Sequence, residues 1–338
     1  MRRLELHVRD GEAFETALKA VRKMDPVDFH ILLPEQQDRK IISVFLRDNT
    51  SQTLVDILQQ ALKDEKDWRL VVMPIEATLP KIEEVAKDPK KAKQKKSNQN
   101  ALREELLHDI EEGAQLDRDF LIMVFLSTVV AAIGLNSNSI AGVIGAMVIA
   151  PLLGPILGFS MGAALGSMDL IRRSSLTLLA GISLALVSAY ALSFVMPLDL
   201  YSRELISRAE VRLDGVALSL AAGGAAALSL ARGQGSTLVG VMVAAALLPP
   251  GAATGLFLGG GHFDLASRAG LLLTLNVAAL VLSALLVFRV KGIRPLTWVE
   301  QKAATKATRI NALAWIVFLL IAAFLIVYLD LGATVEIG

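Results

Sequence analysis

The feature that most constrains this 338-residue chain is a series of long stretches without any charged side chain in its last two thirds. Residues 1–118 hold 44 of the 67 charged residues, and residues 119–338 hold the other 23. Soluble domains contain about 25 % charged residues, so the second segment falls far below that level. We therefore predict a water-soluble part at residues 1–118 and a membrane-embedded part at residues 119–338.

Seven apolar stretches of the second part contain no Asp, Glu, Lys, Arg or His. Their lengths are near the roughly 20 residues that a helix needs to cross a bilayer. They predict an all-α, multi-pass membrane domain whose surface contacts lipid. The stretches are about 120–135, 139–165, 174–197, 215–231, 236–260, 269–288 and 312–329.

The first 79 residues alternate between strand and helix patterns. Residues 3–8, for example, alternate Leu4, Leu6 and Val8 with polar residues, as a half-buried strand does. The expected order is β-α-β-β-α-β, which is typical of an α+β domain with the ferredoxin-like fold. Strands are expected at Arg3–Val8, Phe29–Leu33, Ile41–Leu46 and Trp68–Ile75, and helices near 11–24 and 49–62.

Residues 80–118 carry charges of both signs and predict a connector helix ahead of the membrane domain. Glu5, Arg9 and Asp10 interrupt the apolar run that a signal peptide would need, so the soluble domain at residues 1–79 is expected in the cytoplasm. The net charge of +1 gives no argument for nucleic acid as a partner.

The membrane domain contains an internal two-fold repeat of about 95 residues. Residues 129–195 align with 224–290 without a gap, with 19 identities in 67 pairs. The polar pattern of Gly166, Asp169 and Arg173 recurs at the equivalent positions 261, 264 and 268. Repeats of this kind are typical of transporters, whose sites lie between the two halves. The domain is expected to comprise repeat 1 at about 120–197, an interfacial segment at 198–214 with an amphipathic helix over 200–213, repeat 2 at about 215–290, a loop at 291–310 and a last helix at 311–331.

The middle stretch of each repeat carries two prolines, which are Pro151 and Pro155 in the first and Pro249 and Pro250 in the second. Proline inside a helix removes a hydrogen bond and clashes with a carbonyl group. Each stretch is therefore expected to be a broken spanning helix or a re-entrant hairpin, with its freed backbone groups buried in protein or facing a wet cavity. Spanning helices imply seven crossings and inverted repeats, whereas re-entrant hairpins imply five crossings and parallel repeats. The Lys and Arg residues of the loops fit both arrangements.

Glycines recur at every fourth position in both stretches, at 154, 158, 162 and 166 and at 251, 255 and 259. Such a glycine zipper predicts close helix packing, and the alternative is backbone exposed to a bound or permeating species. These faces also predict a homo-oligomer. The candidate pathway or binding residues are Pro151, Gly154, Pro155, Ser160, Pro249, Pro250, Gly251, Thr254 and Asn276.

Three further sets of polar residues have mainly structural interpretations. Asp169 with Arg173, and Asp264 with Arg268, are i,i+4 pairs expected at membrane edges. Asn276 is more typical of an interhelical hydrogen bond than of a ligand contact. Residues 136–139, Asn-Ser-Asn-Ser, predict a turn with a helix cap, or else the lining of a vestibule.

The residue types argue against enzymatic chemistry. Residues 158–162 match G-x-S-x-G, but they lie in an apolar stretch that offers Ser160 no His or carboxylate partner. The four His residues lack the spacing of metal ligands, and the chain has no Cys. We therefore predict no enzyme, no catalytic residue, no metal site and no cofactor. The absence of carboxylates at membrane depth also argues against proton coupling.

The run Gly145-Ala-Met147-Val-Ile-Ala150-Pro-Leu-Leu-Gly-Pro155, with its echo at 243–251, resembles the membrane protein family called domain of unknown function 389. The resemblance covers about 120–290. It implies a prokaryotic multi-pass inner-membrane protein and supplies no catalytic residues.

Taken with the repeat, these features predict a transporter or channel-like protein for a small solute or ion. Its soluble domain would regulate or assemble it. The alternative is a membrane sensor or scaffold that transports nothing and whose soluble domain does the binding.

Overall fold

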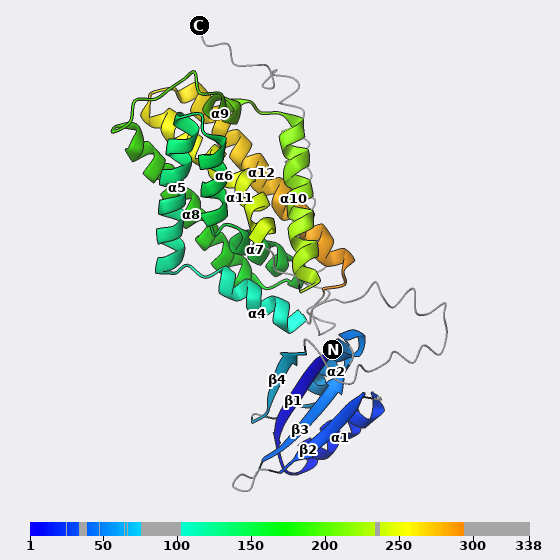
Figure 1. Ribbon diagram of the computed structural model, residues 1–338. Coiled ribbons are helices and arrows are strands. Elements are labelled where there is room, and N and C mark those ends of the chain that lie inside the picture. Colours follow the sequence, from blue (N-terminus) through cyan, green and yellow to red (C-terminus); the bar gives the residue numbers. More distant parts are fainter. Residues whose placement is uncertain are drawn as a thin grey trace. The chain divides into compact units, whose positions relative to one another are not determined.

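The computed structural model describes residues 1–24, 26–33, 39–46, 48–63, 65, 67–75, 103–233 and 237–293. The chain divides into two compact units, Met1–Arg103 and Glu104–Gly338 (Figure 1). The first part of the predicted connector, most of the loop at 291–310 and the last helix at 311–331 lie outside the described residues.

The first unit contains a four-stranded sheet and two helices in the expected order. Its strands follow the order β2-β3-β1-β4, and all neighbouring strands are antiparallel. Leu6 in the centre of the sheet lies opposite Ile42 and Leu70. Every predicted strand and helix of this unit is present, with ends shifted by one or two residues. The elements are β1 (Arg2–Arg9), α1 (Glu12–Lys23), β2 (Asp28–Leu32), β3 (Arg39–Leu46), α2 (Asp48–Ala61) and β4 (Arg69–Pro74).

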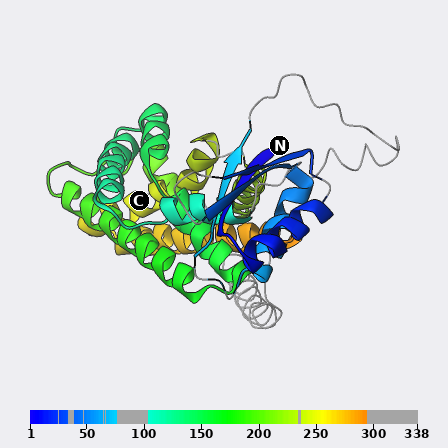
Figure 2. The same ribbon diagram turned by 90° about the horizontal axis from the view of Figure 1, so that it is seen from below.

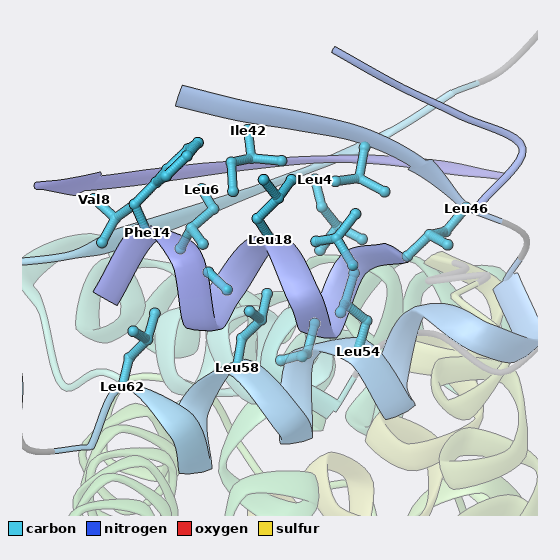
Figure 3. Close-up of a cluster of buried hydrophobic side chains, with 14 residues drawn as sticks. Leu4, Leu6, Val8, Phe14, Leu18, Ile42, Leu46, Leu54, Leu58 and Leu62 are labelled. Carbon is cyan, nitrogen blue, oxygen red and sulfur yellow. The ribbon is translucent and has the colours of Figure 1, made fainter. Parts of the chain in front are cut away.

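Alternating side chains of the central strands build the core of this unit. Leu4, Leu6 and Val8 of β1 are each 1 % exposed, because a strand points every second side chain to the same face. Both helices cover that face, as Figure 2 shows. Phe14 of α1 and Leu58 of α2 meet the strand residues in the core (Figure 3).

The second unit is helical. Five of its described helices are long and apolar enough to cross a membrane, and a sixth crossing results if α6 and α7 count as one bent span. The helices are α4 (Arg103–Gly113), α5 (Arg118–Asn136), α6 (Ile140–Ile149), α7 (Leu153–Leu165), α8 (Met168–Ser193), α9 (Arg203–Ile206), α10 (Leu213–Ala231), α11 (Thr237–Gly259) and α12 (Phe263–Val290).

Side-chain contacts define two ends of this unit, which we call the α4 end and the α9 end (lower and upper in Figure 1). At the α4 end, the Thr177 hydroxyl of α8 donates to the carbonyl of Ala114, 2.8 Å away. At the α9 end, Asn136 donates to the carbonyl of Pro197 at 3.0 Å and accepts from the N–H of Asp199 at 2.8 Å. Helices α5 and α8 therefore both run from the α4 end to the α9 end.

The directions of the remaining helices follow from the helices that they contact. Gly255 and Gly259 of α11 lie against Leu186–Ser193 of α8, so α11 also runs toward the α9 end. Gly215 and Gly223 of α10 lie against Leu272 and Leu280 of α12, so these two helices are parallel and run toward the α4 end. Helices α6 and α7 bend by 53° and continue in that same direction. The first three passes thus run in directions opposite to those of the second three.

Two predictions about the second unit are wrong. Residues 200–213 do not form an amphipathic interfacial helix, because only the four-residue α9 and a 3-10 turn at Ser207–Ala209 are helical. Their apolar side chains, such as Leu205 and Val211, are fully buried in the unit, and Val211 packs on α12. The predicted break at Pro249 and Pro250 is also absent, because α11 is continuous through both prolines.

Candidate functional site

The first proline segment breaks its helix for a local reason. Ala150 ends α6 with extended backbone angles of φ −65° and ψ 119°. Pro151 follows it, and a residue before proline is disfavoured in the α region by its clash with the proline ring. Because α7 begins at Leu153, Pro155 falls in its first turn, where a missing N–H costs no helical hydrogen bond.

The second proline segment stays helical, and a side chain from another helix bonds one of the carbonyls that its prolines leave free. In a regular helix, residue 250 would donate its N–H to the carbonyl of Ala246, but Pro250 has no N–H. Asn276 of α12 takes its place, since its Nδ2 donates to the Ala246 oxygen at 2.8 Å. Asn276 is 5 % exposed, and its Oδ1 has no hydrogen-bond partner. The predicted interhelical hydrogen bond of Asn276 is therefore present at its Nδ2 atom, and its Oδ1 atom takes no part in it.

The position 95 residues before Asn276 is Gly181, which offers no side chain to a carbonyl. A Cβ at this glycine would lie 3.0 Å from the Phe120 ring. The two proline segments therefore meet different surroundings at the same position of the alignment. The break itself lies at Pro151, whose equivalent in the second segment is Ala246 and not a proline.

The two proline segments share a small cavity. Ala150 and Leu152 contribute from the α6–α7 break, and Leu247, Leu248 and Gly251 contribute from α11. The volume of this cavity is about 10 Å³, which is near the minimum for one water molecule. The other lining residues come from α5, α8 and α12, and they are Val124, Ser127, Gly181, Ile182, Ala185 and Leu273.

The two predicted hydroxyl residues lie deep in the packed interior. The Ser160 hydroxyl lies 2.8 Å from the carbonyl oxygen of Ile156 and 3.3 Å from that of Val281 on α12. The Thr254 hydroxyl donates to the carbonyl of Pro250 at 2.7 Å. Ser160 is 0 % and Thr254 8 % exposed, so neither faces an open channel in this conformation.

The predicted glycines differ in what they contact. A Cβ at Gly154 would collide with the backbone of Gly113, and one at Gly158 would meet Ala114 and Ser174. These glycines let the end of α4 approach α7 directly after the break. Gly251 is different, because its nearest neighbour, a Leu273 methyl group, would be 3.9 Å from a Cβ. Gly166 has φ 72° and caps α7.

The charged pairs lie at opposite ends of the unit. Arg173 Nε is 2.9 Å from Asp169 Oδ2 at the start of α8 and thus near the α4 end. Arg268 Nε is 3.2 Å from Asp264 Oδ2 at the start of α12, near the α9 end. Within the described ranges, no group of three or more His, Asp or Glu residues is placed to hold a metal ion.

Sequence reasoning missed several residues of this region. Gly181 and Ser127 line the cavity, and the Ala246 carbonyl receives the Asn276 bond. The equivalence of positions 181 and 276 in the repeat alignment was an available signal. The turn at 136–139 forms as predicted, with Ser139 capping α6, and Asn136 also holds the segment at 197–199.

Comparisons with known proteins find a family model that covers this region. The family model described as domain of unknown function 389 matches residues 147–282, a range that includes both proline segments and Asn276. An uncharacterised protein of Methanocaldococcus jannaschii is 32 % identical over 278 residues, which are 82 % of this chain and 84 % of that one. No solved structure matches the chain significantly.

Proposed function

The chain belongs to the family of the domain of unknown function 389, and we propose that it carries a small solute across a prokaryotic inner membrane. It is a membrane protein with several long apolar helices. Large apolar side chains on these helices, such as Ile122, Leu179 and Leu218, are more than half exposed in the isolated chain, as expected for contact with lipid.

The observation that carries this proposal is the shared cavity. Two proline segments, 95 residues apart in sequence, line the same small space. Transporters built from repeats commonly place their sites where interrupted helices of the two halves meet. In this conformation the space admits no more than about one water molecule, so transport requires the helices around it to move.

The helix directions support an inverted repeat. Helices α5, α6–α7 and α8 run opposite to α10, α11 and α12, and the two equivalent charged pairs lie at opposite ends. This arrangement places the loops after α7, α10 and α12 at the α4 end, with nine Lys and Arg residues by sequence against four in the other loops. The positive-inside rule then puts the α4 end in the cytoplasm. The soluble domain precedes α4 in the chain and is proposed to be cytoplasmic too.

The strand order β2-β3-β1-β4 and the β-α-β-β-α-β sequence support a ferredoxin-like fold for the first unit. We assign this domain a regulatory or assembly role, and we assign the whole protein no enzymatic activity. Because the end of α4 packs on α7 beside the break, a movement of the connector would reach the proposed pathway. The protein is proposed to act as a homo-oligomer, for which native mass spectrometry in nanodiscs is the test.

Cysteine accessibility tests the pathway directly, since the chain has no cysteine of its own. Single variants Ser160→Cys and Thr254→Cys are labelled in proteoliposomes with a membrane-impermeant thiol reagent from each side. Tyr201→Cys, at a position 89 % exposed, is the positive control. Labelling of both deep sites supports a water-accessible pathway that opens transiently. Absence of labelling at both, with a labelled control, contradicts transport.

The dense packing of the same region favours a second candidate, a membrane sensor or scaffold. Ser160, Pro155 and Pro250 are all buried, and the cavity between the proline segments is small and mostly apolar. In this case, substitutions around the cavity would leave ligand or partner binding by the soluble domain unchanged. Solute flux by reconstituted protein separates the candidates.

A further inference from the structure

The buried polar side chains of the second unit present mainly hydrogen-bond acceptors to their surroundings. Six buried hydroxyls donate their proton to a main-chain carbonyl. A hydroxyl that has donated its proton keeps only lone pairs, so it can accept but not donate a further bond. These six residues are Ser127, Thr128, Ser160, Thr177, Ser219 and Thr254.

Asn276 is the strongest acceptor left unsatisfied in this interior. Its Oδ1 is buried without a partner, while its Nδ2 is bound to the Ala246 oxygen. The amide cannot profitably be turned around, because Pro250 supplies no N–H and the Ala246 carbonyl would then face another oxygen. The free atom is therefore the oxygen, and a buried acceptor without a donor is unfavourable until a donor arrives.

Asn276 and Ala246 do not themselves line the cavity between the proline segments, but close neighbours of both residues do. Leu273, three residues before Asn276 and thus on the same side of α12, lines the cavity. On α11, Ala246 directly precedes the lining residue Leu247. Among the described residues of the second unit, no charged side chain is buried that would attract an ion of either sign.

We propose that Asn276 Oδ1 recognises a small solute that donates hydrogen bonds, either a neutral hydroxyl or amide compound or an ammonium-type monovalent cation. Small anions, which are acceptors only, find no donor at this oxygen. This inference rests on the proposed transport function and names the substrate class for it. It adds a recognition role to the structural role that Asn276 already has toward Ala246.

The two roles of Asn276 can be separated by a compensating change. Asn276→Leu alone leaves the Ala246 carbonyl without a donor, and it is expected to lower stability. In Pro250→Ala, the new backbone N–H can bond to Ala246, so the amide of Asn276 is no longer needed there. The double variant Pro250→Ala/Asn276→Leu then lacks the recognition oxygen while the carbonyl stays satisfied. Pro250→Ala is the reference for the double variant.

Flux is measured with the full chain in proteoliposomes, using glycerol and urea as neutral donors, methylammonium as the cation and nitrate as the anion. We expect flux of at least one donor probe and none of nitrate in the wild type. We expect a loss of about tenfold in donor flux in the double variant relative to Pro250→Ala, which is the effect of one hydrogen bond. The comparison of glycerol and urea with methylammonium distinguishes a neutral solute from a cation.

A second readout does not depend on transport. The side-chain carbonyl carbon of every asparagine is labelled with ¹³C. The infrared band of Asn276 is then obtained by subtracting the spectrum of Asn276→Leu from that of the wild type. A donor at Oδ1 lowers this carbonyl frequency, so addition of glycerol, urea or methylammonium is expected to shift the band, in wild type and in Pro250→Ala alike. The double variant is expected to show no shift.

The outcomes separate the inference from the proposed function. Equal donor flux in the double variant and its reference overturns the inference, because Asn276 then only compensates Pro250. Flux of nitrate in preference to the donors also overturns it, while transport itself stands. No flux of any probe contradicts the transport function, and the infrared band then decides: a shift with a donor probe supports recognition, and an unchanged band overturns it.

Discussion

Gly223 of α10 is the site where a single added methyl group should separate two helices. A Cβ there would lie 2.5 Å from the Leu280 oxygen and 2.8 Å from the Leu280 Cα, and both atoms belong to the backbone of α12. Ordinary contacts of a Cβ begin at 3.4 Å, so the helices must separate by up to 0.9 Å. A gap of that size forfeits a quarter to a half of the dispersion energy of each facing atom pair.

The neighbouring Gly224 provides a matched control. Its Cβ would lie 3.9 Å from a Val287 methyl group, which is an ordinary contact. Both residues are inside α10, so the helix-forming gain of alanine over glycine, about 1 kcal/mol, is shared and cancels in the comparison. Overpacking costs about 1–3 kcal/mol, and Gly223→Ala should be less stable than Gly224→Ala by that amount.

The assay is thermal unfolding of the full chain in one detergent, followed by circular dichroism. At about 2–4 °C per kcal/mol for a unit of this size, the midpoint of Gly223→Ala should lie about 2–12 °C below that of Gly224→Ala. Packing of small residues rather than water exclusion holds membrane helices together, so the difference should persist in lipid nanodiscs. Equal midpoints, or a higher one for Gly223→Ala, would refute the close approach of α10 to α12.

Three further predictions concern topology and stability. Cysteines in place of Met168 and Tyr201 should react with an impermeant reagent from opposite sides of the membrane, and labelling from one side would contradict the helix directions. Leu6→Ala should destabilise the first unit by about 2–5 kcal/mol in denaturant unfolding, because Leu6 is buried in the sheet core, whereas the exposed Leu33→Ala should change it by less than about 0.5 kcal/mol. Asn136→Ala removes the bonds to Pro197 and Asp199 and should lower the thermal stability of the second unit by about 1–2 kcal/mol; an unchanged midpoint would show that the loop is held by other contacts.

The first unit was predictable because its information is local. Alternation of Leu4, Leu6 and Val8 identifies β1 from six residues of sequence, and the same is true of the helical spacing of Phe14 and Leu18. The order of elements along the chain, β-α-β-β-α-β, was the expectation, and the observed strands and helices follow it. Such patterns predict strands and helices correctly because each of these elements buries one face against a neighbouring layer of the fold.

The apolar helices of the second unit were predictable from the sequence, whereas the points at which these helices break were less so. Pro151 acts on its immediate neighbour Ala150, and that break was foreseen as one of two alternatives. Pro249 and Pro250 have at least the same local tendency, yet α11 is continuous. The carbonyl that Pro250 leaves free is bonded by Asn276, 26 residues beyond Pro250 and on another helix, which local sequence rules do not include. The amphipathic interpretation of residues 200–213 failed similarly, since Leu205 and Val211 face other helices instead of lipid.

The two aligned segments thus place their prolines in different ways. In the first, α6 ends just before Pro151, whereas in the second α11 continues through both prolines and Asn276 bonds the Ala246 carbonyl while one of its own atoms, the oxygen, stays unsatisfied. A purely structural solution would place both polar atoms of the amide in bonds, as buried amides usually are. Asn276 binds α11 through its nitrogen and leaves its oxygen unbonded near the shared cavity. This arrangement suits it to bind a solute that enters the cavity. For this reason, Asn276 rather than either hydroxyl residue is the side chain on which the proposed pathway should be tested first.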